Sequence, residues 1–241
     1  MHVKVRTQEE LDAALARGDV AVLCAGEFEV VAKGEDAPCI IVMAREARLY
    51  LVAAGDSRPL VDARGDSCPN IDAKGSSKPY VVALDESNPI VNAYDDSAPH
   101  IEAWERSRPF VESWGDSRPH IRCYDDSAPQ SASWGGARPY IECWDRSAPY
   151  VESWARVAPH VEARDESSPR VKSMQDSAPS VVVWEDSRPH IESWDRSMPH
   201  IDVRGDNLPI VLAYNESVPH VESWGRLLTQ DSEPRQEAPV G

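Results

Sequence analysis

The chain has 241 residues, and 41% of them are hydrophobic, which is enough for a packed interior and argues against disorder throughout. Its net charge is −16, from 41 acidic and 25 basic residues. Binding to a nucleic-acid backbone depends on clustered lysine and arginine, so this charge argues against direct nucleic-acid binding. It is compatible with solubility, with basic partners, or with mimicry of a nucleic acid's negative surface.

The first 30 residues are expected to form an N-terminal cap. Thr7 and Glu10 fit a capping box at the start of a short helix, and Gly18 fits its end. Residues 20–32 then read as a strand that enters the first coil of the structure that follows.

Several features of the chain predict a cytoplasmic protein. The N-terminus lacks an apolar core and a small-residue cleavage site, so no signal peptide is expected. Apolar runs fall far short of the roughly 20 residues of a membrane span, so no membrane contact is expected either. The five cysteines are odd in number and form no CxxC motif, which is typical of free thiols in a reducing compartment.

A ten-residue phrase repeats along most of the chain. Proline recurs at every tenth residue from Pro59 to Pro219, and Val or Ile follows two residues later, from Val61 to Val221, except at Ser131. The phrase is V-x-(A/S)-(W/Y/R)-(G/D)-(D/E/R)-S-x-P-x, and we number its positions by the last digit of the residue number, with 10 for residues that end in zero. Alternating small or apolar residues at positions 1 and 3 predict a strand, and Ser-x-Pro predicts a corner.

Two phrases are expected to make one coil. Position 3 alternates between two families along the chain, one of serine and one of Ala, Cys or Val. The serine family is Ser113, Ser133, Ser153, Ser173 and Ser193, and the other is Ala103, Cys123, Cys143, Ala163 and Val183. A ten-residue coil gives no reason for this alternation, whereas a twenty-residue coil with two unlike faces does.

The predicted fold is therefore all-β, a single-stranded parallel β-solenoid with about 20 residues per coil and an N-terminal helical cap. The cap covers residues 1–30, about ten coils cover 31–228, and 229–241 form a disordered tail. Cys123 and Cys143 should stack one coil apart as buried apolar residues, because parallel stacked side chains suit a disulfide poorly.

The repeat resembles the tandem-repeat β-solenoids of bacteria and their phages. The match is "VESWGDS" at 111–117, preceded by the cap motif "EELDAAL" at 9–15. The resemblance implies a rod-like solenoid but no particular task. Ice-nucleation repeats and pentapeptide-repeat proteins are similar in shape. The chain departs from the first because its only threonines are Thr7 and Thr229, and from the second because it lacks a central Leu or Phe every five residues.

Two outward columns are candidate binding surfaces. An aromatic stripe at position 4 could support the ladder by ring stacking or bind a partner. It consists of Tyr94, Trp114, Trp134, Trp154, Trp194 and Tyr214. An acidic column at position 5 could bind a basic partner or help to imitate a nucleic acid. It consists of Asp85, Glu105, Asp125, Asp145, Asp165 and Glu185.

No catalytic residue, metal ligand or cofactor is predicted. The His-x-Glu pairs could bind a metal or pass protons, but they arise from the repeat itself. A catalytic site should instead appear once, as a departure from the phrase. We therefore expect a non-catalytic binding or scaffold protein with a protein partner, and a homodimer stays an alternative. The other hypotheses are an acidic nucleic-acid mimic that inhibits a DNA-binding enzyme and a polysaccharide-acting β-helix enzyme.

Overall fold

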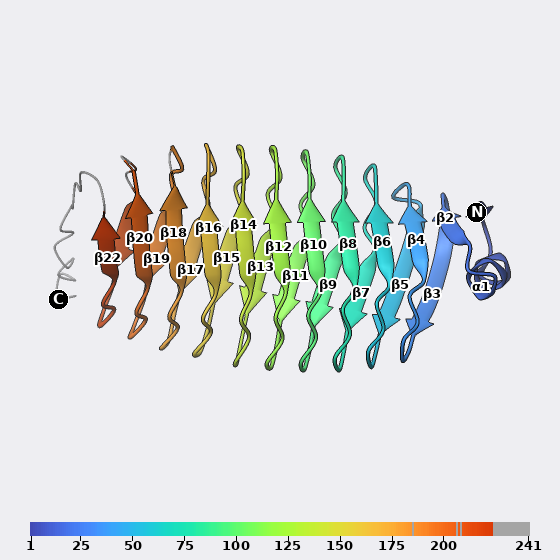
Figure 1. Ribbon diagram of the computed structural model, residues 1–241, viewed down its shortest axis with the longest axis horizontal. Coiled ribbons are helices and arrows are strands. Elements are labelled where there is room, and N and C mark those ends of the chain that lie inside the picture. The colour runs from blue at the N-terminus through green and yellow to red at the C-terminus, as the bar shows by residue number, and fades with distance from the viewer. Residues whose placement is uncertain (185, 206, 208, 224–241) are drawn as a thin grey trace, which may run out of the picture.

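The protein is a long rod of stacked coils, seen in Figure 1, which shows a computed structural model. The structure describes residues 1–184, 186–205, 207 and 209–223. These residues form a parallel β-solenoid of about 11 turns with about 20 residues in each. The predicted fold class is therefore confirmed, while the predicted tail at 229–241 lies outside the described residues.

Within the described residues, the strands form two parallel sheets that run the length of the rod. The twelve-stranded sheet contains β1 (His2–Val5), β2 (Val20–Leu23), β4 (Cys39–Val42), β6 (Leu60–Ala63), β8 (Tyr80–Ala83), β10 (His100–Ala103), β12 (His120–Cys123), β14 (Tyr140–Cys143), β16 (His160–Ala163), β18 (Ser180–Trp184), β20 (His200–Arg204) and β22 (His220–Ser223). The ten-stranded sheet contains β3 (Gly26–Ala32), β5 (Ala47–Ala53), β7 (Asn70–Ala73), β9 (Ile90–Ala93), β11 (Phe110–Ser113), β13 (Gln130–Ser133), β15 (Tyr150–Ser153), β17 (Arg170–Ser173), β19 (His190–Ser193) and β21 (Ile210–Ala213).

The register of the strands confirms the twenty-residue coil. Ser133 pairs with Ser113 on one side and with Ser153 on the other. Cys123 pairs with Cys143 in the other sheet. Both cysteines are buried free thiols, as the sequence predicted. Each phrase therefore supplies one strand, and consecutive phrases alternate between the two sheets.

The interior is narrow and built from small side chains. Positions 1, 3, 7 and 9 of the phrase point inward, as in Val151, Ser153, Ser147 and Pro149, which are all buried. Positions 2, 4 and 10 are in most coils partly exposed, which is the alternation that a strand with one buried face requires. In successive coils, residues of the same phrase position therefore stack on one another.

Hydrogen bonding between coils continues around the corners. The backbone N–H of His100 donates to the carbonyl of Pro79 at 2.8 Å, and that of Arg108 donates to the carbonyl of Ser87 at 3.0 Å. Proline lacks an N–H, so it suits a corner where its carbonyl alone is used. This arrangement explains why proline recurs once in every phrase.

The helix α1 (Gln8–Ala16) covers the end of the rod near β1 and β3. Glu10 N donates to Thr7 Oγ1 at 3.2 Å, and Glu10 Oε2 accepts from Arg6 N at 2.7 Å, so the carboxylate bonds one residue before the cap residue. Within the described residues, no helix is long and apolar enough to cross a membrane. Residues 20–32 form two strands, β2 and β3, which belong to different sheets.

Candidate functional site

The predicted aromatic stripe lies in one column along the ten-stranded sheet. Each of its residues directly follows a strand, and its backbone N–H bonds to the coil before, as Trp134 N does to Ser113 O at 2.9 Å. The ring centroids of Trp114 and Trp134 are 4.3 Å apart with planes at 13°. Those of Trp194 and Tyr214 are 4.0 Å apart at 16°. The column brings the predicted residues together, with Met174 between Trp154 and Trp194.

The stacking decides which part of each ring a partner can reach. Because neighbouring rings are nearly parallel at about van der Waals distance, they cover one another's faces and leave mainly their edges to solvent. Trp114 is 38% exposed and Tyr214 is 37% exposed, so this edge surface is substantial. The stripe therefore suits contact with a broad apolar surface better than it suits ligands that bind ring faces.

A second aromatic stripe, which was not predicted from the sequence, lies on the twelve-stranded sheet. Trp104 and Tyr124 stack at 4.0 Å and 14°. Further along, Arg164 lies between two tryptophans, with its guanidinium carbon 4.7 Å from the Trp144 ring and 5.2 Å from the Trp184 ring. Such cation–π contacts stabilise a mixed column. The signal was present in the phrase, where position 4 is Trp, Tyr or Arg.

A third column of rings follows position 10 of the same sheet. Tyr80 and His100 stack at 4.9 Å and 13°, and Tyr140 and His160 stack at 5.1 Å and 10°. Between these pairs, the His120 ring packs edgewise against both neighbours. The twelve-stranded sheet thus carries two aromatic rows, at positions 10 and 4, with a row of mostly carboxylates between them at position 2.

Those carboxylates are held by basic and hydroxyl groups. Glu142 Oε2 accepts from Arg122 Nε at 2.7 Å and lies 3.1 Å from His120 Nε2. Burial disfavours the charged form of Glu142, but the hydrogen bonds from Arg122 and His120 outweigh burial and lower its pKa. Burial, and then a hydrogen bond to Glu162 at 2.7 Å, raise the pKa of the Tyr140 hydroxyl.

The predicted acidic column has a backbone explanation. Asp85, Glu105, Asp125, Asp145 and Asp165 all have φ between 54° and 59°, and Glu185 lies outside the described residues. This left-handed region favours Gly, Asn and Asp, and glycine occupies the equivalent place at Gly65 and Gly205.

The carboxylates of this column also bond to neighbouring turns. Asp85 Oδ2 accepts from Gly65 N at 2.8 Å, one coil earlier. Asp145 Oδ2 accepts a longer bond of 3.4 Å from Asp125 N in the same way. The acidic column therefore contributes to holding the turns together, whatever else it binds.

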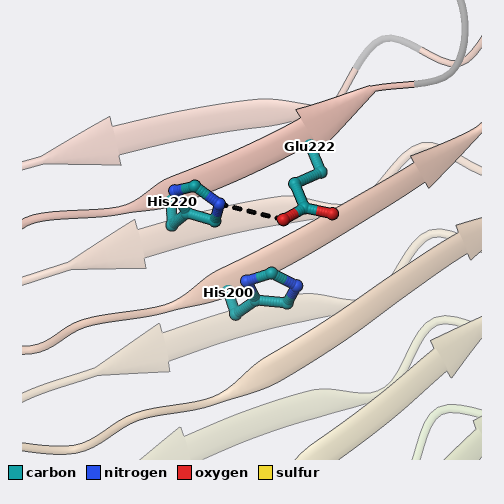
Figure 2. Close-up of side chains that lie close together, drawn as sticks. All are labelled: His200, His220 and Glu222. Carbon is teal, nitrogen blue, oxygen red and sulfur yellow. Dashed lines mark hydrogen bonds and ion pairs between the residues drawn. The ribbon is translucent and has the colours of Figure 1, made fainter.

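Figure 2 shows a cluster near the end of the rod opposite α1. His200 and His220 stack at 5.2 Å and 19° on adjacent strands β20 and β22, and His220 Nε2 lies 3.1 Å from Glu222 Oε1. One nitrogen or oxygen from each of the three lies within 4.8 Å of the others. All three side chains are exposed.

An open groove of about 1010 Å³ lies near α1. Gln8 from the helix and Glu27, Arg48 and Tyr50 from β3 and β5 contribute to its lining. Arg48 and Glu27 form an ion pair at 3.1 Å, and both are more than 70% exposed. Charges so accessible to water have no special reactivity, so the groove gives no catalytic assignment.

Comparison with protein-family models, curated proteins and solved structures gave no match to this chain.

Proposed function

We propose that this protein is a non-catalytic binding or scaffold rod that presents its aromatic faces to a protein partner. The observation that carries the proposal is that partly exposed rings at position 4 stack between adjacent coils on both sheets. Solenoids commonly use such extended, repeated surfaces for recognition. Aromatic side chains supply much of the binding energy at protein interfaces.

The bacterial or phage origin and the cytoplasmic location belong to this proposal. The repeat phrase at 111–117 and the cap motif at 9–15 support the first. The second is supported by the five free thiols, which are typical of a reducing compartment.

The runner-up is an acidic mimic that inhibits a DNA-binding enzyme, favoured by the net charge of −16. Two features weaken the mimicry. Some position 5 carboxylates already accept hydrogen bonds from turn N–H groups, so they present less negative charge to a partner. Arginines interrupt the neighbouring column, where Arg146 pairs with Asp126 at 2.8 Å and Arg106 pairs with Glu86 at 2.6 Å.

The third alternative, a polysaccharide-acting enzyme, requires a group of reactive residues that occurs once. The carboxylate networks of the twelve-stranded sheet instead recur from coil to coil, as at Glu142 and Glu162. Repetition of one arrangement favours binding over catalysis, and for this reason we rank the enzyme last.

The decisive experiment compares two triple variants with the wild type in binding to a partner captured from native lysate. Replacement of Trp114, Trp134 and Trp154 by Ser removes the stripe of the ten-stranded sheet. Replacement of Trp104, Trp144 and Trp184 by Ser is the matched control on the other face. We expect salt-tolerant binding that replacement of Trp114, Trp134 and Trp154 abolishes and that the control variant retains.

A salt titration separates the alternatives. A nucleic-acid mimic loses affinity steeply between about 50 and 200 mM salt, and its binding depends little on the tryptophans. Binding that survives both triple variants and also high salt would contradict the aromatic-face proposal and the mimic together. Far-UV circular dichroism of each variant shows that the solenoid is retained.

A further inference from the structure

The two histidines at the end of the described solenoid differ in surroundings from the other histidines of their column. Strands β20 and β22 pair in register, which places His200 directly beside His220 and Asp202 beside Glu222. Asp202 is paired with Arg204 at 2.8 Å. Within the described residues, Glu222 has His220 as its ion-pair partner, and His200 forms no ion pair. Among the residues that the structure describes, the cluster thus combines two imidazoles with a carboxylate that pairs with no lysine or arginine.

The other adjacent histidine pair of the column, His100 and His120, has different neighbours. Its two rings meet edge to face at 90°, with centroids 4.7 Å apart, and Tyr80 of the preceding coil stacks on the His100 ring. Arg122 Nη1 lies 3.8 Å from Glu102, and its Nε lies 2.7 Å from Glu142. A guanidinium therefore already occupies the place of a cation between these carboxylates, and it would repel a metal ion.

We propose that His200, His220 and Glu222 form a binding site for one zinc ion. Two histidine nitrogens and a carboxylate oxygen are a ligand set that zinc accepts, with a fourth position left for water or a further ligand. Tetrahedral zinc ligands at about 2.0–2.1 Å from the metal lie roughly 3.3 Å from one another. The three atoms lie within 4.8 Å of each other, and the two stacked histidine rings, which are exposed, would turn about their side-chain bonds so that a nitrogen of each faces the same ion.

Calcium and magnesium fit the site poorly. Both prefer six or more oxygen ligands, whereas two of the three groups in this cluster are imidazoles. Imidazole instead suits zinc, copper and nickel. The sequence alone predicts no metal site, because His-x-Glu recurs throughout the repeat. What distinguishes this copy is the stacked second histidine and the absence of a competing arginine at Glu222 among the described residues.

Zinc at this place would join two coils. His200 belongs to β20, while His220 and Glu222 belong to β22, which is the last described strand of its sheet. Val221 in β22 is only partly buried, in contrast to the fully buried Ile201 in β20. A metal bridge would therefore secure the coil that has the least burial to hold it in place.

The test is a zinc titration of untagged protein, freed of metal with a chelator, by calorimetry. We expect one zinc ion per chain. His200→Gln, His220→Gln and Glu222→Gln should each weaken zinc binding by about 10- to 100-fold or more. Loss of a residue that only supports a metal ligand typically weakens metal binding by about that factor, and these residues are ligands themselves. The matched control, His100→Gln with His120→Gln, should bind zinc as the wild type does.

A second measurement follows hydrogen exchange of the β22 amides with and without zinc. Zinc should slow this exchange in the wild type and in the control, but not in Glu222→Gln. The proposal is overturned if the wild type shows no saturable binding of one equivalent, if the three variants bind like the wild type, or if the control loses binding as they do. Because all the substituted side chains lie on the outer surface, the variants should fold, and circular dichroism checks that they do.

Discussion

Side chains that point into the rod meet residues of the same kind one coil above and below. The exception is at Ser131, which lies in register between Val111 and Val151 and is the one position 1 residue of the repeat that is neither Val nor Ile. Ser131 is 3% exposed, and its hydroxyl has no hydrogen-bond partner within the described residues. A buried hydroxyl without a partner lowers stability, so this residue is a weak point in the column.

Ser131→Val should stabilise the protein. The change removes the unpaired hydroxyl, which costs about 1–3 kcal/mol when buried, and restores apolar contact with two valines. We expect the free energy of unfolding in urea to rise by about 1 kcal/mol or more. Ser133→Val is the matched control, because it also removes a buried hydroxyl without a partner, but Ser133 stacks between two serines, where a larger side chain should overpack the interior. A lower urea midpoint for Ser131→Val would refute this account of the column.

Titrating groups on the outer surface should set the limits of pH stability. Tyr150 has a pKa raised to about 12 by burial and then by its hydrogen bond to Glu152. The folded pKa exceeds the ordinary value of 10.0, so this contribution is complete below pH 10 and is lost as the pH rises toward 12. Tyr150→Phe should flatten the alkaline fall in the urea midpoint, and an unchanged alkaline fall would argue against this role.

At acid pH the stabilising pKa shifts are downward and belong to carboxylates. Glu142 and Glu162 have lowered pKa values, because burial is outweighed by hydrogen bonds from Arg122 and from Arg164 respectively. Their contribution is therefore complete above the ordinary value of 4.5 and is lost as the pH falls through the lowered folded values. Glu142→Gln should reduce the acid fall in the urea midpoint, and an acid fall as steep as that of the wild type would contradict this role.

At the scale of the single phrase, the turn is the part whose backbone limits the choice of residue. Position 5 has a positive φ in both Gly115 (67°) and Ala155 (52°), although alanine adopts this region at a cost. A Cβ added to Gly115 would meet no atom closer than 3.5 Å, so space does not decide between the two residues there. Backbone conformation should therefore govern substitutions at Gly115.

Ala155→Gly should stabilise the protein, and Gly115→Ala should destabilise it, each by about 1 kcal/mol. The magnitude is the roughly 1–2 kcal/mol cost of a left-handed L-residue, less the entropy that glycine gains in the unfolded chain. Thermal unfolding of the two variants beside the wild type checks both directions. Shifts of the same sign in both variants would contradict the conformational explanation.

The strand, the corner, the coil length and the inward-facing positions could be predicted from the sequence, because stacking of the coils favours similar residues at each phrase position. It was less informative about the outer surface. The acids of position 5 were interpreted as a surface charge, while their recurrence also reflects the positive φ of residues such as Asp85. The second stripe was overlooked because Arg164 interrupts its aromatics. Side-chain pairing, as at His200 and His220, depends on rotamers that no repeat pattern specifies.

At the scale of the whole molecule, each coil contacts mainly the coils directly before and after it. Stability in such a rod is a sum of neighbouring interfaces, so damage to one coil can separate the rod into two parts. Val151 is fully buried in β15, which pairs with β13 and β17. An ion at this point would lie in an interior with no partner for it.

Val151→Asp should therefore divide or unfold the solenoid. We expect either loss of the folded state or two separate transitions in urea, one for the coils on each side of β15. Limited proteolysis should then cut near residue 151. The matched surface change Glu152→Gln should leave a single transition, and wild-type unfolding of Val151→Asp would show that position 1 does not point inward.

The two-phrase coil also restricts how the length of this gene product can change. Deletion of residues 120–139 removes one strand from each sheet, so β14 takes the place of β12 and every remaining side chain keeps its face. Deletion of 120–129 alone instead brings β13 into the place of β12, and the stripe that contains Trp134 passes to the opposite side of the rod from that point on. Gains and losses of sequence should thus be tolerated in steps of twenty residues, and a step of ten should exchange the two faces over the rest of the molecule.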